Sequence, residues 1–565
     1  MKVTQIMMEC LLEQGVDTVF GYPGGTILNV YDELYRYSDK IRHILTAHEQ
    51  GASHAADGYA RSTGKVGVCF ATSGPGATNL TTGIATAYMD SSPVVFITCN
   101  VAQSLIGKDS FQEVDITGIT MPITKTNYLV RDPYKIADIM REAFAIAASG
   151  RPGPVMIDIP KDITAMDVPF EPRAKKEHFK HGRLSAFIKG GTHGFRLREP
   201  NGEDIDILIN MIQEAERPMI IAGGGIILAN AGKEFREFAE RIDTPVATTL
   251  MGIGSIPADH PLCTGMIGMH GTVASNRMCA ASDLIVAIGT RFSDRVASNT
   301  ESFGKGAKIV HIDIDRAEID KNVISDHHIT GDAKRVLEIL NSKVPEIKRE
   351  RWRAEVDAMR ANSADSGSGG MQPKDILQAI WDGTGGQAII TTDVGQHQMW
   401  SCQHFNYQYP RQLITSGGFG TMGFGLGAAM GSKLGNPDKT VVLTTGDGCF
   451  RMNCNELATI EHYNIPVIIV VFNNGALGMV RQWQTLMYGR RYSSTTLDRG
   501  PDFVKLAGAY GISGARAENI DEFKAEFERA VKSGKPAVID CKLDIDELVR
   551  PMVPGGKPIT GFIIE

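Results

Sequence analysis

The sequence predicts an α/β protein built from three doubly wound parallel-sheet domains. Apolar runs of strand length alternate with helical stretches along most of the chain. Several of these runs are continuously apolar, as expected for strands buried on both faces of a parallel sheet. Polar stretches interrupt the alternation at two places, and 565 residues are comfortably enough for three domains of this class.

The first predicted domain covers residues 1–172 and the second covers residues 204–345. Strands are expected in the first within residues 15–24, 41–49, 65–74, 93–100 and 154–160. Strands of the second are expected within residues 217–226, 243–252, 283–292 and 307–315. Residues 173–203 between them are charged and contain glycine, which predicts a surface linker with an insertion.

The third domain is predicted at residues 373–545. A linker at 346–372 precedes it, because residues 361–370 are polar, rich in glycine and poor in apolar side chains. A C-terminal tail is expected at 546–565.

Composition excludes several function classes. The net charge of −7 and the lack of a basic tract argue against a general nucleic-acid or anionic-membrane surface. The apolar runs are shorter than the ~20 residues that span a bilayer, and the N-terminus has no signal-peptide core, so we expect a cytoplasmic protein. The nine cysteines lack metal-ligand spacing, which favours reduced thiols.

The most informative motif lies in the third domain, where residues 449–472 separate Gly446-Asp447-Gly448 from Asn473-Asn474. Apolar strands at 439–445 and 466–472 lead into the two ends of this interval. Ligands of parallel sheets bind at the carboxyl ends of strands, so Asp447 and Asn474 can converge on one hard cation. Mg²⁺ takes such oxygen ligands together with phosphates. The alternative is two ordinary turns around a βαβ unit.

The connection between these strands is expected to be helical. Asn453 is predicted to cap the helix, with Glu456 completing a box-like start before Leu457 and Ile460. The helix is expected to end near Asn464.

These motifs resemble the thiamine diphosphate (ThDP) dependent decarboxylases and carboligases, and within them the biosynthetic acetohydroxyacid (acetolactate) synthase family. The resemblance runs from about Val3 to the tail VRPMVPGGKPI, except near residues 174–200, which depart from the family pattern. Its most specific pieces are FGYPGGTILNVYDEL, AHEQGASHAADGYAR, TSGPGATNL, FQEVDITGITMPITK, RPGPVMIDIPKD, GTRFSDRV, DVGQHQMW and GALGMVRQWQ. The three domains are then expected to bind the ThDP pyrimidine, FAD and the ThDP diphosphate with Mg²⁺, in that order.

The resemblance implies roles for individual residues in the third domain. Expected ThDP contacts are Val394, Gly395, Gln396, His397, Gly420, Met422, Asp447, Gly448, Asn474 and Met479. Expected metal ligands are Asp447, Asn474 and the backbone carbonyl of Ala476. On the residues alone, His397 could equally be a surface histidine and Met422 simply a core side chain.

In the first domain the resemblance makes Glu49 the group that hydrogen-bonds the aminopyrimidine ring and controls its proton. By position alone, a Glu at the start of a helix is more often a charge favoured by the helix dipole. Gly25, Gln112 and Lys161 are expected around the reaction pocket. Trp483 and Arg295 are expected to select the acceptor substrate, against the alternatives of a core tryptophan and an ion pair with Asp294.

A second cofactor site is expected in the middle domain, where backbone amides at a glycine turn suit phosphates. The resemblance assigns FAD contacts to Gly223, Gly224, Gly225, Thr249, Leu250, Met251, His270, Gly289, Arg291, Asp313, Asp332 and Arg151. The separate G-x-G-x-x-G match at Gly418, Gly420 and Gly423 is weak and indicates a close-packed helix start.

The resemblance also implies partners. Pyruvate and 2-ketobutyrate are the expected substrates, a homodimer or larger assembly would share active sites between chains, and a small regulatory subunit is expected. Three alternatives stay open: a catabolic acetolactate synthase without FAD, a pyruvate oxidase, and a non-catalytic assembly subunit that binds nucleotide.

Overall fold

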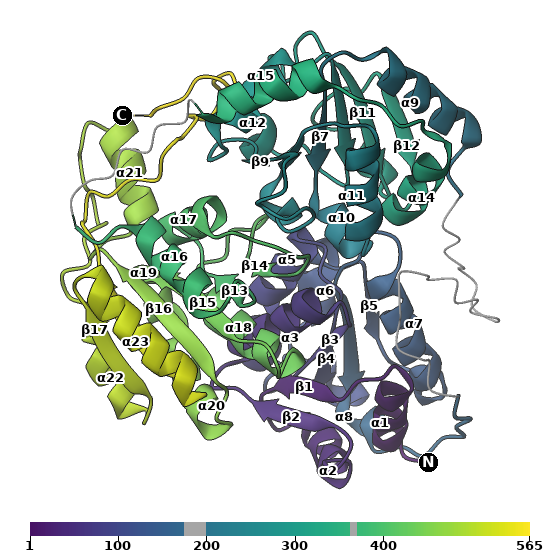
Figure 1. Cartoon of the computed structure of the whole chain (residues 1–565). Helices are drawn as coiled ribbons and strands as arrows, with labels where there is room; N and C mark the ends of the chain where they lie inside the picture. Colours follow the sequence, from purple (N-terminus) through teal and green to yellow (C-terminus); the bar gives the residue numbers. More distant parts are fainter. Residues whose placement is uncertain (174–198, 362–369, 565) are drawn as a thin grey trace.

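The computed structural model describes residues 1–173, 199–361 and 370–564. It forms three lobes, each built around one six-stranded parallel sheet (Figure 1). The predicted insertion at 174–200 and the polar linker at 361–370 lie almost entirely outside the described residues. The prediction of three doubly wound parallel sheets is confirmed.

The N-terminal sheet has the strand order β2-β1-β3-β4-β6-β5. Its strands are β1 (Thr18–Gly21), β2 (Arg42–Leu45), β3 (Gly67–Ala71), β4 (Val94–Asn100), β5 (Thr126–Leu129) and β6 (Val155–Pro160). Its helices are α1 (Val3–Glu13), α2 (Leu28–Arg36), α3 (Glu49–Thr63), α4 (Pro75–Asn79), α5 (Thr81–Met89), α6 (Ile116–Thr120), α7 (Ile136–Ala148) and α8 (Lys161–Thr164).

The middle sheet has the order β12-β11-β10-β7-β8-β9. Its strands are β7 (Pro218–Ala222), β8 (Val246–Thr248), β9 (Cys263–Met266), β10 (Leu284–Ile288), β11 (Lys308–Asp313) and β12 (His327–Thr330). Its helices are α9 (Gly202–Glu214), α10 (Gly224–Leu228), α11 (Gly232–Arg241), α12 (Val273–Ala281), α13 (Asp294–Ala297), α14 (Ala333–Lys343) and α15 (Glu350–Ala361).

The C-terminal sheet has the order β14-β13-β15-β16-β18-β17. Its strands are β13 (Ile389–Thr392), β14 (Leu413–Ile414), β15 (Val441–Gly446), β16 (Val467–Asn473), β17 (Ser513–Ala517) and β18 (Ala537–Lys542). Its helices are α16 (Pro373–Gly383), α17 (Gln396–His404), α18 (Phe424–Gly435), α19 (Asp447–Asn453), α20 (Leu457–His462), α21 (Gly478–Met487), α22 (Phe503–Ala509) and α23 (Ile520–Ser533).

A helical segment begins after Asn453 as expected, because the 3-10 turn Cys454–Glu456 leads into α20, but Asn453 makes no capping hydrogen bond to it and another helix precedes it. Helix α19 begins at Asp447, directly after β15, and Asn453 is its last residue. The Asn453 side chain donates to the carbonyl oxygen of Gly423, and the Glu456 carboxylate accepts from the backbone N–H groups of Ala47 and His48 in the N-terminal domain. Contacts with distant segments therefore replaced the local capping box.

The N-terminal and C-terminal domains meet along α3 and α18, whose small residues let the two backbones touch (Figure 1). A Cβ at Gly58 would overlap the carbonyl oxygen of Ala428, and one at Gly431 would overlap that of Ala55. The contacts advance along both helices in the same direction, from Gly51 beside Gly427 to Thr63 beside Gly435. Both helices therefore begin at the same end of the interface.

Within the described residues, no helix combines the length and the apolar character that a membrane span requires. All nine cysteines are free thiols, and eight of them are buried.

We predict that Gly431→Ala destabilises the protein by about 1–3 kcal/mol, because the new methyl group must push α3 away from α18. The matched control is Gly508→Ala in α22, where an added Cβ meets nothing within 4 Å and alanine favours the helix. Chemical denaturation of both variants measures the difference. Equal stability changes in the two variants would contradict close backbone packing at Gly431.

Candidate active site

Three neighbouring strands of the C-terminal sheet deliver polar side chains to one edge. Strand β15 pairs in parallel with β13 on one side and with β16 on the other. Asp393 follows β13, Asp447 follows β15 and Asn474 follows β16. The carboxyl ends of these parallel strands therefore gather two carboxyl groups and one amide. The spacing of the two motifs predicts Asp447 and Asn474 at this edge, and Asp393 is an addition.

A small cavity of about 50 Å³ opens at this edge, and the residues that line it all come from the C-terminal domain. Ten of the residues predicted for ThDP or metal line it: Val394, Gly395, Gln396, His397, Met422, Asp447, Gly448, Asn474, Ala476 and Met479. Gly420 lies instead on a larger neighbouring cavity. The two cavities share Val394, Gly395 and Met479 in their walls.

The donor set at this cavity suits a hard cation. Burial raises the pKa of Asp447 to about 6, opposed by nearby backbone N–H groups, so a cation beside this carboxyl would relieve the burial cost. The Nδ2 of Asn474 donates to Oε1 of Gln396 at 3.0 Å, which fixes the orientation of the amide. Among the described residues no cluster of three His, Cys, Asp or Glu side chains could hold a metal, so a cation here would also need amide, carbonyl and phosphate oxygens.

His397 is buried at the same cavity rather than at the surface, with 5% of its area exposed. Burial lowers its pKa to about 3, so its ring is neutral near pH 7. No group in the described part of the chain hydrogen-bonds its Nε2 atom. A buried nitrogen in this state is a suitable partner for a bound polar ligand.

The larger cavity, of about 360 Å³, lies between the three domains. It is lined by ten of the residues predicted for FAD: Gly224, Gly225, Thr249, Leu250, Met251, His270, Gly289, Arg291, Asp313 and Arg151. Trp483 and Arg295 also line it. Trp483 is half-buried, and Arg295 is exposed and forms the ion pair with Asp294 at 3.2 Å.

Two of the residues predicted for FAD lie elsewhere. Asp332 lines an adjoining cavity of about 300 Å³, which shares Gly225, Gly289 and Asp313 with the larger one. Gly223 packs its backbone against Gly289, so no side chain fits there. The glycine turn after β7 therefore brings bare backbone to the cavity wall.

The polar groups of the larger cavity fit a ligand that carries donors and acceptors. Burial lowers the pKa of His270 to about 4, and its Nδ1 has no hydrogen-bond partner among the described residues. Burial raises the pKa of Asp313 to about 6. Arg151 pairs with Glu318 at 2.7 Å and with Asp315 at 3.2 Å. These ion pairs fix its positively charged guanidinium at the same wall.

Glu49 is the first residue of α3 and has 8% of its area exposed. Its Oε2 accepts from Nδ2 of Asn79 at 2.9 Å, and its Oε1 lies beside Gly76. Glu49 does not line either cavity that holds the predicted ThDP residues of the same chain. The buried Glu49 carboxylate therefore lies outside the small cavity that Asp447 lines.

Gly25, Gln112 and Lys161 line neither of these two cavities; Gly25 follows β1 and Lys161 follows β6, at the carboxyl edge of the sheet where Glu49 follows β2. Gln112 packs against Gly74, and Gly24 beside Gly25 packs against Thr72. Lys161 is exposed and directly follows β6.

Several supporting residues escaped the sequence analysis. Asp393 accepts from the backbone N–H groups of Gly423 at 2.7 Å and Val394 at 3.2 Å. Gln482 accepts from Nε2 of Gln396 at 3.0 Å. Asp393 could have been predicted, because it directly follows a strand and precedes the predicted contact Val394. Gln482 and Glu456 could not, because their contacts are with distant residues and no local pattern indicates them.

Comparisons with known proteins identify the three domains. The chain matches the thiamine pyrophosphate enzyme N-terminal TPP binding domain over residues 1–119, the central domain over 205–340 and the C-terminal TPP binding domain over 393–541.

Similar proteins cover nearly the whole chain. A probable acetolactate synthase large subunit of Methanocaldococcus jannaschii is 47% identical over 100% of this chain and 95% of its own length. The acetolactate synthase large subunit of Parasynechococcus marenigrum is 44% identical over 98% of this chain and 89% of its own. The acetolactate synthase of Mycobacterium leprae is 45% identical over 98% and 88%. The chain belongs to the thiamine pyrophosphate enzymes and, within them, to the acetolactate synthase large subunits.

Proposed function

We propose that this chain is the catalytic subunit of a biosynthetic acetohydroxyacid synthase that uses ThDP, Mg²⁺ and FAD. The observation that carries the proposal is the continuity of the two cavities. The residues predicted for ThDP and Mg²⁺ line the small one, most of those predicted for FAD line the large one, and Val394, Gly395 and Met479 belong to both.

Bound ThDP supplies the electron sink that allows pyruvate to lose carbon dioxide and its two-carbon fragment to join a second 2-ketoacid. Asp447, Asn474 and the carbonyl of Ala476 would hold Mg²⁺ against the diphosphate. His397 and Gly448 would contact the diphosphate itself, and Met422 would give the cofactor an apolar contact.

Glu49 would hold the aminopyrimidine ring and move its proton. Because Glu49 lies outside the small cavity of its own chain, its position supports a site shared between two chains, with Glu49 from one and Asp447 from the other. A homodimer is then the smallest active assembly.

Trp483 and Arg295 would select the acceptor at the wall of the larger cavity. The apolar face of Trp483 would contact the ethyl group of 2-ketobutyrate, and the Arg295 guanidinium would bind the incoming carboxylate. The products would be 2-acetolactate or 2-aceto-2-hydroxybutyrate, the first intermediates of branched-chain amino-acid synthesis.

A small regulatory subunit is the further partner that we propose. The similar proteins of Methanocaldococcus jannaschii and Parasynechococcus marenigrum are named large subunits, which supports a smaller partner.

The test of the proposal is an acetolactate assay with pyruvate, with each cofactor omitted in turn, followed by competition between pyruvate and 2-ketobutyrate. We expect activity to need ThDP, Mg²⁺ and FAD, and 2-ketobutyrate to be the preferred acceptor. Activity without FAD would instead indicate the catabolic enzyme. Catalytic bleaching of the flavin by pyruvate without oxygen would indicate a pyruvate oxidase.

We predict that Glu49→Gln lowers kcat about 10² to 10⁴-fold with ThDP saturating, because the amide cannot exchange the ring proton. The matched control is Glu203→Gln, which removes a first-turn glutamate from α9, where it is exposed. Steady-state kinetics compare the two variants. Near wild-type turnover in Glu49→Gln would contradict the proposed role. It would favour the alternative that Glu49 is a negative charge stabilised by the dipole of α3.

We also predict that the affinity for Mg²⁺ falls about tenfold for each pH unit below about 6. Burial favours the protonated form of the Asp447 carboxyl. In the metal-free protein this group therefore stabilises the fold fully at low pH, and that stabilisation is lost as the pH rises through about 6. The cation has the opposite preference because it binds the ionised carboxylate.

The measurement is a Mg²⁺ titration at saturating ThDP between pH 5 and pH 8, followed by intrinsic fluorescence. A phosphate group also titrates near pH 6, so the affinity of free ThDP for Mg²⁺ is measured over the same range and subtracted. A flat corrected affinity across pH 6 would contradict the role of Asp447.

A further inference from the structure

The segment 415–422, which connects β14 to α18, forms part of the wall of both cavities. Ser416, Gly417 and Gly420 line the larger cavity, and Met422 lines the smaller one. Any ligand that fills either cavity therefore meets this segment.

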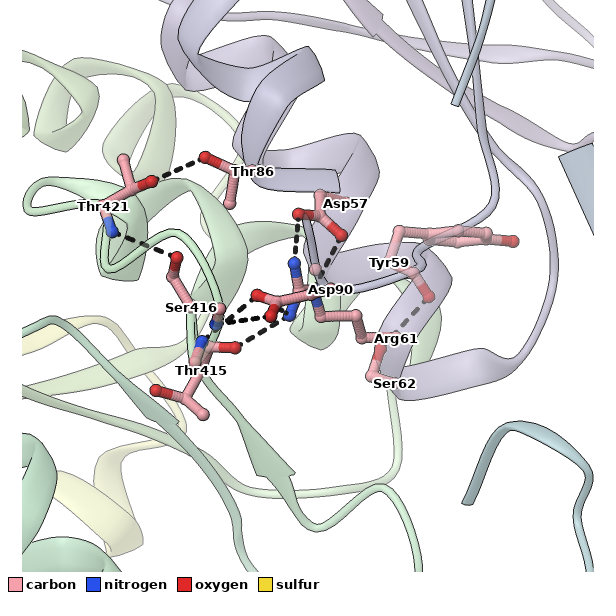
Figure 2. Close-up of polar contacts among 12 residues, drawn as sticks. Asp57, Tyr59, Arg61, Ser62, Thr86, Asp90, Thr415, Ser416 and Thr421 are labelled. Carbon is pink, nitrogen blue, oxygen red and sulfur yellow. Dashed lines mark hydrogen bonds and ion pairs between the residues drawn. The ribbon is translucent and has the colours of Figure 1, made fainter. Parts of the chain in front are cut away.

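The backbone of this segment is held by the N-terminal domain. The N–H groups of Gly417 and Gly418 donate to the two carboxylate oxygens of Asp90, at 3.1 Å and 2.6 Å. Arg61 donates from one nitrogen to Asp90 at 2.9 Å and to the carbonyl oxygen of Thr415 at 2.8 Å (Figure 2). The hydroxyls of Thr86 and Thr421 form a further bond at 2.6 Å (Figure 2).

The arginine in this cluster is itself fixed. Asp57 accepts two hydrogen bonds from Arg61, both at 2.7 Å, in the bidentate geometry that suits a guanidinium. The two carboxylates raise the pKa of Arg61 although its burial acts in the opposite direction. One guanidinium thus faces two carboxylates, so Arg61 cannot neutralise both. The N–H groups of Gly417 and Gly418 stabilise the remaining negative charge on Asp90.

The middle domain meets the same point. A Cβ at Gly418 would lie 2.7 Å from Asp90 Oδ1 and 2.8 Å from Nη2 of Arg291, and one at Gly417 would overlap the sulfur of Met251. Met251 and Arg291 line the larger cavity. Residues 417–418 of the C-terminal domain therefore contact both other domains, and only glycine fits at these two positions.

We propose that Asp90, fixed by Arg61, is a positioning residue that orders segment 415–422 in advance, so that each cofactor binds without needing the other to order their shared wall. This inference rests on the proposed function, because it takes the larger cavity as the flavin site and the smaller as the ThDP diphosphate site.

This independence of the two cofactors follows from preorganisation. A segment that is ordered before binding costs a ligand little, whereas a segment released from Asp90 must be ordered by the ligand itself. Without the Asp90 carboxylate, whichever cofactor binds first would order the wall for the second. Linkage then requires each cofactor to tighten the other by the same factor.

The test uses Asp90→Asn in the full chain, with the dissociation constants of FAD and of ThDP with Mg²⁺ each measured with and without the other cofactor. Flavin fluorescence and calorimetry give these constants. We expect each cofactor alone to bind roughly tenfold more weakly than to the wild type, as for a lost hydrogen bond to a charged group. Saturation with one should restore most of the affinity for the other.

Hydrogen exchange at the amides of residues 417–418 provides a readout that is independent of activity. These amides should exchange faster in Asp90→Asn without cofactors and regain protection when both are bound. The matched control is Asp502→Asn, which alters a carboxylate that also accepts from two backbone N–H groups and pairs with an arginine, but at α22 and outside both cavities. It should leave both affinities unchanged.

The outcomes separate the two claims. Failure of the wild type to bind flavin overturns the proposed function, whatever Asp90 does. Wild-type affinities and exchange in a folded Asp90→Asn protein overturn the inference, as does a loss of thermal stability alone. If Asp90→Asn does not fold, Thr421→Val removes only the bond to Thr86 and must show a smaller shift in the same direction; no shift overturns the inference.

Discussion

The parallel packing of α3 on α18 is the constraint on which the arrangement of the active-site groups depends. Because backbone touches backbone at Gly58 and Gly431, the two helices have little freedom to slide or rotate. Both helices begin at the same end of their contact, so one interface fixes the Glu49 end of the N-terminal domain relative to the cavity-lining segment before Phe424. A shift of either helix would move both.

The C-terminal domain reinforces this placement through Glu456. Glu456 follows α19, the helix that begins at Asp447. Its buried carboxylate accepts hydrogen bonds from the backbone N–H groups of Ala47 and His48, immediately before Glu49. A Cβ at Gly51 would overlap that carboxylate, so only glycine fits beside it. Burial raises the pKa of Glu456, and the amides that it accepts from oppose that shift. The backbone at the start of α3 is thereby held from the opposite domain.

Sequence patterns predicted most strands of the first two sheets and the central strands β15 and β16 of the third, but they missed several edge strands. Central strands such as β4 and β16 are buried at every residue and read as continuous apolar runs. Edge strands such as β5 and β12 are partly exposed, and their mixed composition gives no such run. Motif residues that follow strand ends were predictable because a parallel sheet brings those ends to one edge. The pairing of Arg61 with Asp90, and of Glu456 with residue 47, depends on how whole domains dock, and nothing in the local sequence encodes it.

Asp393 and Asp447, at the carboxyl edge of the C-terminal sheet, show how similar burial serves different purposes. Burial raises the pKa of both Asp393 and Asp447 to about 6. Asp393 uses its oxygens on the amides of Val394, Gly423 and Gly425, which orders the start of α18. Asp447 lies at the first position of α19 and faces the cavity, so its charge is available to a ligand. Asp393 is thus held by the backbone of its own domain, whereas Asp447 faces the cavity, where a bound cation would offset the burial of its negative charge.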